Sequence, residues 1–147
     1  MKAKSGRPRA RYADRARVLL VCAAVIAAVT LAGCGSSKPA YCTDRANLEN
    51  SVKGLTSVNL TSGGGISALT AQVKTIASDA DALANSAKSD FPTQTSAISS
   101  SVNALKTSAT ALASSPSAAL IVTVTKDAAS VVSSVKSFTD ATSSQCG

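Results

Sequence analysis

The chain has 147 residues, of which 45% are hydrophobic and 3% aromatic, and its formal net charge is +7. This length allows one domain. The charge is uneven, because residues 1–33 carry seven of the fifteen basic residues and one of the eight acidic ones, which leaves +1 for the remainder. After Tyr41 the only aromatic residues are Phe91 and Phe138. The composition therefore excludes a nucleic-acid-binding surface, which needs clustered cations and stacking rings.

Residues 1–33 have the order of a secretory signal peptide. Basic residues end at Arg17, and the fifteen residues 18–32 that follow carry no charge. As a helix these fifteen residues reach about 22 Å, whereas a permanent membrane span must cross about 30 Å. We therefore expect this segment to direct export and then to be cleaved.

The end of this segment, Leu31-Ala32-Gly33-Cys34, resembles the lipobox of bacterial lipoproteins. The resemblance implies that a signal peptidase recognises Leu31, Ala32 and Gly33 and cleaves before Cys34. It also implies that the Cys34 thiol carries a diacylglyceryl group with palmitate-like chains, and two such chains anchor a protein stably. The richness of the chain in alanine, serine, threonine and valine is similar to that of small actinobacterial lipoproteins.

These features divide the chain into three parts. We expect residues 1–33 to be the cleaved signal peptide, residues 34–40 the lipidated N-terminus with a flexible tether, and residues 41–147 the folded domain. The lipid then places the domain outside the cell membrane, facing away from the cytoplasm. The alternative is a plain signal peptide, or an uncleaved anchor, in which Cys34 is incidental.

The four cysteines are expected to have different fates. Cys22 leaves with the signal peptide and Cys34 is lipidated, so only Cys42 and Cys146 remain to pair. An exported protein folds in an oxidising compartment, which favours a disulfide between these two. The alternative is a redox-active or metal-binding pair, but the chain has no CxxC spacing and no histidine.

Small and apolar residues recur at spacings of three and four through the predicted domain, which is the pattern of helices that meet along a seam. Four segments show this pattern, and the first is the shortest. The predicted core positions are Tyr41, Leu48, Val52 and Leu55 in the first segment; Ile66, Leu69, Val73, Ile76, Ala80, Leu83 and Ala87 in the second; Ile98, Val102, Leu105, Ala109 and Leu112 in the third; and Ile121, Val124, Ala128, Val131, Val135 and Phe138 in the fourth.

Capping residues predict where the helices begin. Thr43 or Asp44 is placed to cap the first helix, and Asp90 to cap the third with Pro92 in its first turn. Ser115-Pro116 opens the last helix in the same manner. The residues 120–125 include a β-branched run that is also compatible with a strand, and we favour a helix there.

The expected fold is an all-α, antiparallel up-down four-helix bundle with a short first helix and its ends joined by the disulfide. An even number of passes brings Cys42 and Cys146 to the same end of the bundle, whereas three passes leave them a helix length apart. Residues 56–65 then cover the remaining distance as an irregular segment. Partial disorder of this low-complexity region is the alternative, although the sustained pattern argues against it.

The sequence lacks the residues of known catalytic sites. Glu49 is the only glutamate, and no GxSxG or SxxK stands in a context that would activate its serine as a nucleophile. Asp79 and Asp81 are the only close acidic pair, but on a helix they diverge by about 200°, so we expect solvated charges. We predict no catalytic residue, metal or cofactor, and the small side chains of the seam predict little room for a ligand.

These observations favour a membrane-anchored lipoprotein with a non-enzymatic helical domain. Its expected role is protein contact or structural support in the cell envelope, with an envelope protein as the partner. The contact surface is expected in residues 56–65 or on an exposed face rich in alanine and serine. The alternative is a binding module for a small apolar or cell-wall ligand, held between helices that open at the glycine-rich end.

Overall fold

The computed structural model describes residues 38–147. The predicted signal peptide and the residues Leu31, Ala32, Gly33 and Cys34 lie outside the described residues. Residues 38–147 form four helices and no strand, and the helices are α2 (Ala40–Leu55), α3 (Gly65–Ala87), α4 (Pro92–Ser114) and α5 (Ala118–Cys146).

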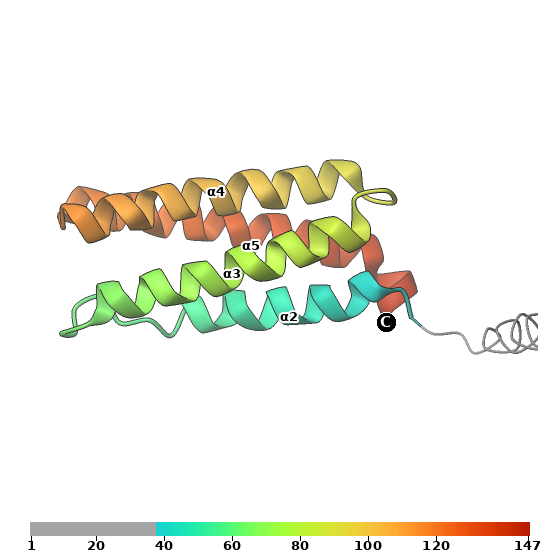
Figure 1. Ribbon diagram of the computed structural model, residues 1–147, viewed down its shortest axis with the longest axis horizontal. Coiled ribbons are helices and arrows are strands. Elements are labelled where there is room, and N and C mark those ends of the chain that lie inside the picture. The colour runs from blue at the N-terminus through green and yellow to red at the C-terminus, as the bar shows by residue number, and fades with distance from the viewer. Residues whose placement is uncertain (1–37) are drawn as a thin grey trace, which may run out of the picture. The chain divides into compact units, whose positions relative to one another are not determined.

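The four helices run alternately in opposite directions (Figure 1). Each packs against the next along the chain, and α5 returns to pack against α2. The predicted all-α four-helix bundle is therefore confirmed. The helix α2 has 16 residues against 29 in α5, so the prediction of a short first helix is also confirmed. Residues 120–125, which include the β-branched run, are helical.

The core consists of the predicted apolar positions with few exceptions. Ile66 and Ala128 are half-buried, and Ile121 is 38% exposed. The prediction that Ile121 belongs to the core is wrong, because α2 ends well before the level at which α5 begins (Figure 1), so no helix covers the first turn of α5 on this side. The other predicted core positions are buried.

Three polar side chains also lie in the core, which the hydrophobic pattern did not predict. Thr95, Ser108 and Thr142 are buried, and each hydroxyl donates a hydrogen bond to a carbonyl of the preceding turn. A serine or threonine can occupy a buried helical position in this way, because its hydroxyl finds an acceptor in its own helix.

The start of α2 differs from the prediction. The helix begins at Ala40 directly after Pro39, with no side-chain cap, so Thr43 and Asp44 lie inside it. The Asp44 carboxylate instead accepts a hydrogen bond of 2.6 Å from the Ser86 hydroxyl of α3. Asp44 therefore joins two helices rather than capping one.

The other two predicted caps are also displaced by one or two residues. The residue before α4 is Phe91 rather than Asp90, with Pro92 at the start of the helix as expected. The cap of α5 is Ser117, whose hydroxyl accepts a hydrogen bond from the Leu120 amide at 3.3 Å. The Ser115-Pro116 pair therefore lies before α5 and not in its first turn.

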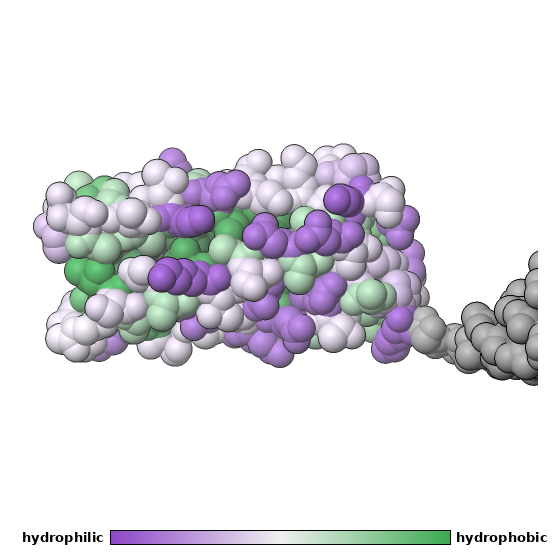
Figure 2. Space-filling view, viewed as in Figure 1, coloured by the Kyte–Doolittle hydropathy of each residue, from purple (hydrophilic) through white to green (hydrophobic). Residues whose placement is uncertain are grey.

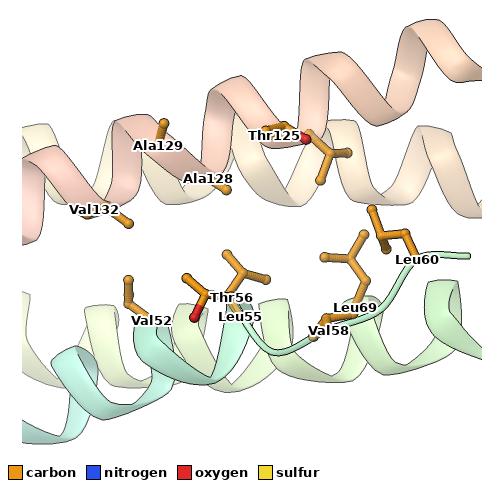
Figure 3. Close-up of a pocket in the computed structure, with 11 residues that line it drawn as sticks. Val52, Leu55, Thr56, Val58, Leu60, Leu69, Thr125, Ala128, Ala129 and Val132 are labelled. Carbon is orange, nitrogen blue, oxygen red and sulfur yellow. The ribbon is translucent and has the colours of Figure 1, made fainter.

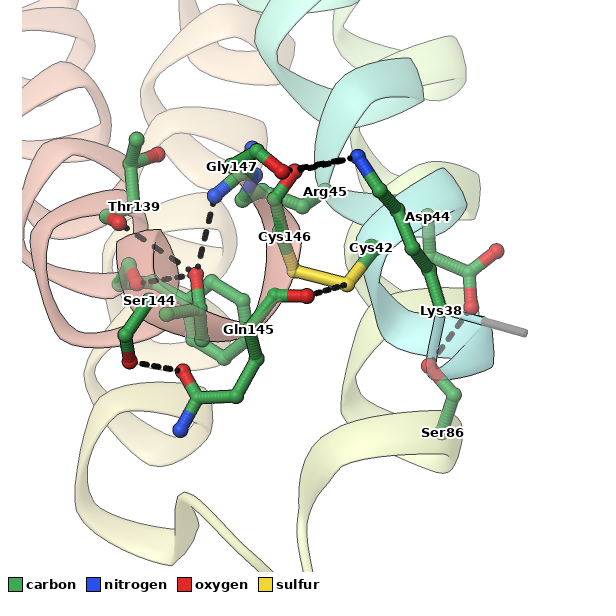
Figure 4. Close-up of a disulfide and its surroundings, with 12 residues drawn as sticks. Lys38, Cys42, Asp44, Arg45, Ser86, Thr139, Ser144, Gln145, Cys146 and Gly147 are labelled. Carbon is green, nitrogen blue, oxygen red and sulfur yellow. Dashed lines mark hydrogen bonds between the residues drawn. A yellow bond between two sulfur atoms is a disulfide. The ribbon is translucent and has the colours of Figure 1, made fainter. Parts of the chain in front are cut away.

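The predicted disulfide closes the domain. Cys42 and Cys146 are bonded, with their Cα atoms 5.3 Å apart and a sequence separation of 104 (Figure 4). At the same end of the bundle, the Lys38 ammonium donates hydrogen bonds to the carbonyl of Cys146, at 3.1 Å, and to that of Gly147, at 3.0 Å. The first and last described residues are thus held together.

An aromatic cluster lies in the core of the bundle. Tyr41, Phe91 and Phe138 contact one another edge to face, with ring centroids between 5.4 and 6.3 Å apart. These rings come from the start of α2, the α3–α4 connection and the last third of α5. Edge-to-face pairs stabilise beyond their burial alone. All the aromatic residues of the described part of the chain therefore gather near the disulfide end of the bundle.

Loss of the disulfide should lower the free energy of unfolding by about 4 kcal/mol, because the open chain regains the entropy of a loop of about 100 residues. The measurement is urea unfolding of the mature protein with and without reductant, compared with Cys42→Ser/Cys146→Ser. The double variant should be insensitive to reductant. An unchanged midpoint in the reduced protein would contradict the view that the bond stabilises the fold.

The connection between α2 and α3 is an irregular run of turns over residues 56–64. Its last residue, Gly64, has φ of 98° and is the one residue among 38–147 with positive φ. This left-handed conformation is unfavourable for any residue with a Cβ atom. The glycine thereby sets the direction in which α3 leaves the connection.

Gly64→Ala should reduce the stability by about 1–2 kcal/mol, because alanine is strained in the left-handed region. Gly63→Ala is the matched control, since a Cβ atom at Gly63 meets nothing within 4 Å and φ there is not positive. Urea midpoints of both variants check this. Equal losses in the two variants would show that the conformation of Gly64 is not the cause.

Candidate functional site

The shortness of α2 divides its seam with α5 into two unlike halves. Near the disulfide, α2 and α5 face each other directly, whereas beyond Leu55 the irregular residues 56–64 replace the helix (Figure 1). The first half of the seam is bridged by polar side chains. The second half is apolar and partly open, and we identify it as the candidate site.

The polar half is held by a network around Arg45. The Arg45 Nη1 donates to the hydroxyl of Thr142 at 3.2 Å, and the Arg45 Nε lies 3.5 Å from a Glu49 carboxylate oxygen. The same oxygen accepts a hydrogen bond of 2.6 Å from the Thr139 hydroxyl. Because Arg45 and Glu49 belong to α2 and both threonines to α5, the network fixes the two helices to each other.

The apolar half is a groove of about 350 Å³ between α2, residues 56–60, α3 and α5 (Figure 3). In Figure 3 the side chains of Val52, Leu55 and Leu60 face those of α5 across the groove. Its volume falls in the range of small-molecule sites, about 300–1,000 Å³. We call it the α2–α5 groove, and its lining residues are Val52, Leu55, Thr56, Val58, Leu60, Leu69, Val124, Thr125, Ala128, Ala129 and Val132.

This groove departs from the expectation that the small side chains of the seam leave little room for a ligand. The reason is the length of α2, since no helix fills the space that α5 presents beyond Leu55. The connecting residues 56–60 cover that space incompletely. They nevertheless contribute to the lining of the groove. The glycine-containing segment 56–65, one of the two expected contact surfaces, therefore lies at the candidate site.

A second hollow of about 260 Å³ continues the groove toward the disulfide and shares Val52 and Val132 with it. Charged side chains line this continuation. Asp140 is paired with Lys136 at 2.9 Å, and Glu49 is engaged by Arg45 and Thr139. Lys53, an exposed residue that also lines the hollow, makes no ion pair with any described residue. The groove thus has an apolar end and an end with a free cation.

Hydrogen bonds to α3 fix the position of the α2 wall. The Gln72 amide donates to the carbonyl of Ser51 at 2.6 Å, and the Ser51 hydroxyl donates to the carboxylate of Asp79. Asp79 is half-buried, so the expectation of a solvated charge is wrong for it, whereas Asp81 is exposed. The sequence pattern does not indicate that Asp79 binds Ser51, because this contact depends on how α2 packs against α3.

Large hydrophobic side chains are exposed on α5 beside the groove. Val122 is 70% and Val132 44% exposed, and Ile121 lies on the same helix. Among the described helices, α5 alone has the length and apolar composition of a membrane span, and most of that apolar stretch lies outside the buried core. In the bundle α5 packs against α4 and α2. Its exposed apolar residues are therefore available for binding.

A smaller hollow of about 210 Å³ lies between α3 and α4. Figure 2 shows hydrophobic surface between these helices, flanked by hydrophilic side chains, in the half remote from the C-terminus. Lys74 and Lys106 line this hollow above Val73, Ala77 and Ala109. Its volume lies below the usual range of ligand sites. Two wider hollows, of about 630 and 530 Å³, lie on α4 and between α4 and α5, but polar and small side chains make up nearly all of their lining. We therefore place the candidate site at the α2–α5 groove, whose lining is mostly apolar.

The predicted site residues fall into two groups. Cys42 and Cys146 are brought together at the disulfide end, away from the groove, and have a structural role. The lipidation and recognition residues at 31–34 lie outside the described residues. Within residues 38–147, no three histidine, cysteine or acidic side chains gather where they could hold a metal ion.

Comparisons with protein-family models, with curated proteins and with solved structures found no match for this chain.

Arg45→Met should lower the free energy of unfolding by about 1–2 kcal/mol, because Glu49 and Thr142 then lose a partner at a half-buried seam. Lys136→Met is the matched control, since its ion pair with Asp140 has the same spacing but is exposed, and such pairs contribute less than about 1 kcal/mol. Urea unfolding measures both. Equal effects would contradict the role given to Arg45.

Proposed function

We propose that this chain is a lipid-anchored, outward-facing protein of the bacterial cell envelope whose helical domain works by binding at the α2–α5 groove. The apolar groove is the observation that carries the binding role, because an open apolar surface of this size calls for an occupant. The lipobox-like residues 31–34 support the anchor. The disulfide supports export, since such bonds persist in oxidising compartments.

The arrangement of polar groups supports a role without catalysis. The chain has no histidine, and the acidic groups of the α2–α5 seam are engaged in ion pairs or hydrogen bonds. The groove itself presents only two hydroxyls, those of Thr56 and Thr125, among nine apolar residues. Neither hydroxyl has a neighbouring base in the lining that would activate it as a nucleophile.

Two kinds of occupant fit this proposal. A small apolar ligand is favoured by the volume of the groove and by its apolar lining. An envelope protein is the second candidate, favoured by the exposed side chains of Val122 and Val132 on α5. Both use the surface that the short α2 leaves open.

Intact mass of the protein extracted from membranes of an expressing bacterium tests the anchor. We expect a chain that begins at Cys34, carries a diacylglyceryl group and has lost two hydrogen atoms through oxidation of Cys42 and Cys146 to the disulfide. Cys34→Ala should accumulate as the uncleaved, unmodified precursor, because the thiol that accepts the lipid is missing. An unlipidated wild-type chain, or lipidation of Cys34→Ala, would overturn the proposed anchor.

A further inference from the structure

We propose that the α2–α5 groove binds one molecule of a single-chain anionic lipid, with its acidic head group at Lys53 and its hydrocarbon tail toward Leu60. This inference rests on the proposed function and names the ligand of that site. Three features of the groove lead to it, namely its volume, its length and its distribution of charge.

The volume and the lining suit a single hydrocarbon chain. The apolar part of the groove offers about 350 Å³, which falls in the range of small-molecule sites, and nine of its eleven lining residues are apolar.

The groove is elongated, as an extended tail requires. On α5 its lining runs from Val124 to Ala129 and Val132, and the continuation reaches Thr139 and Asp140. Lys53 lines the continuation only, so a tail that leads from Lys53 toward Leu60 follows the stretch from Val132 to Val124. This stretch is about 12 Å long on α5.

The charge fixes the orientation of the ligand. The apolar end has no charged lining residue, and burial there of each methylene contributes about 0.8 kcal/mol. At the other end the carboxylates of Glu49 and Asp140 already have cationic partners, whereas Lys53 has none among the described residues. An anionic head group gives Lys53 an ion-pair partner, whereas a neutral ligand leaves it without one.

Photolabelling of the full-length lipidated protein in vesicles of its own membrane tests the inference. The probe is a palmitic acid analogue with a diazirine near the end of its chain, and peptide mapping locates the adducts. We expect adducts in residues 56–60 and 124–129, which line the apolar end. The equivalent fatty alcohol probe should label these residues about tenfold less, because it lacks the charge that Lys53 binds.

The charge variants sharpen this test. Lys53→Glu should reduce labelling by the acid about tenfold and leave labelling by the alcohol unchanged. Lys126→Glu is the matched control, since Lys126 is exposed on α5 and lines none of the hollows described above, and it should label as the wild type does. Far-UV circular dichroism equal to that of the wild type shows that both variants are folded.

Three results would overturn the inference. Equal labelling of the groove by acid and alcohol would show that the groove does not select an anionic head group. The groove would still bind an apolar ligand, so the proposed function would stand. Adducts only outside the groove would remove the ligand and the proposed binding role together. Loss of labelling in Lys126→Glu to the same extent as in Lys53→Glu would show a general effect of charge near the membrane.

Discussion

The disulfide between Cys42 and Cys146 is the constraint on which the arrangement of this domain depends. It fixes the first turn of α2 beside the last turn of α5, and thereby sets the register of the two helices along their whole seam. Because α2 has 16 residues and α5 has 29, this register leaves the first half of α5 without α2 beside it. The groove follows from that difference in length.

The two ends of the bundle consequently have different physical character. Around the disulfide, the aromatic cluster and the Arg45 network fill the seam with close packing and paired charges. At the far end, residues 56–60 close the seam incompletely and leave apolar side chains in contact with water. The candidate binding surface therefore lies away from the disulfide, the aromatic cluster and the Arg45 network.

Much of the fold could be predicted from the sequence, because the core positions of α3 and α4 repeat at helical spacing and the two remaining cysteines allow one pairing. The predicted caps at Asp44 and Asp90 are wrong. For Asp44 the reason is that local sequence signals do not show the hydrogen bond that its carboxylate accepts from Ser86 of α3. The groove could not be predicted either. It lies where the apolar pattern of α5 continues, at Ile121, although α2 has already ended. This difference is visible only once the four helices are assembled.

The central claim is that the open half of the α2–α5 seam is a binding site for a single-chain anionic lipid. The most direct measurement is amide hydrogen exchange of the lipidated protein in nanodiscs, with and without added palmitate. We predict slower exchange in residues 56–62 and 121–129 when palmitate is present, and no change between α3 and α4. Unchanged exchange at the groove, or protection centred on Lys74 and Lys106, would contradict the account.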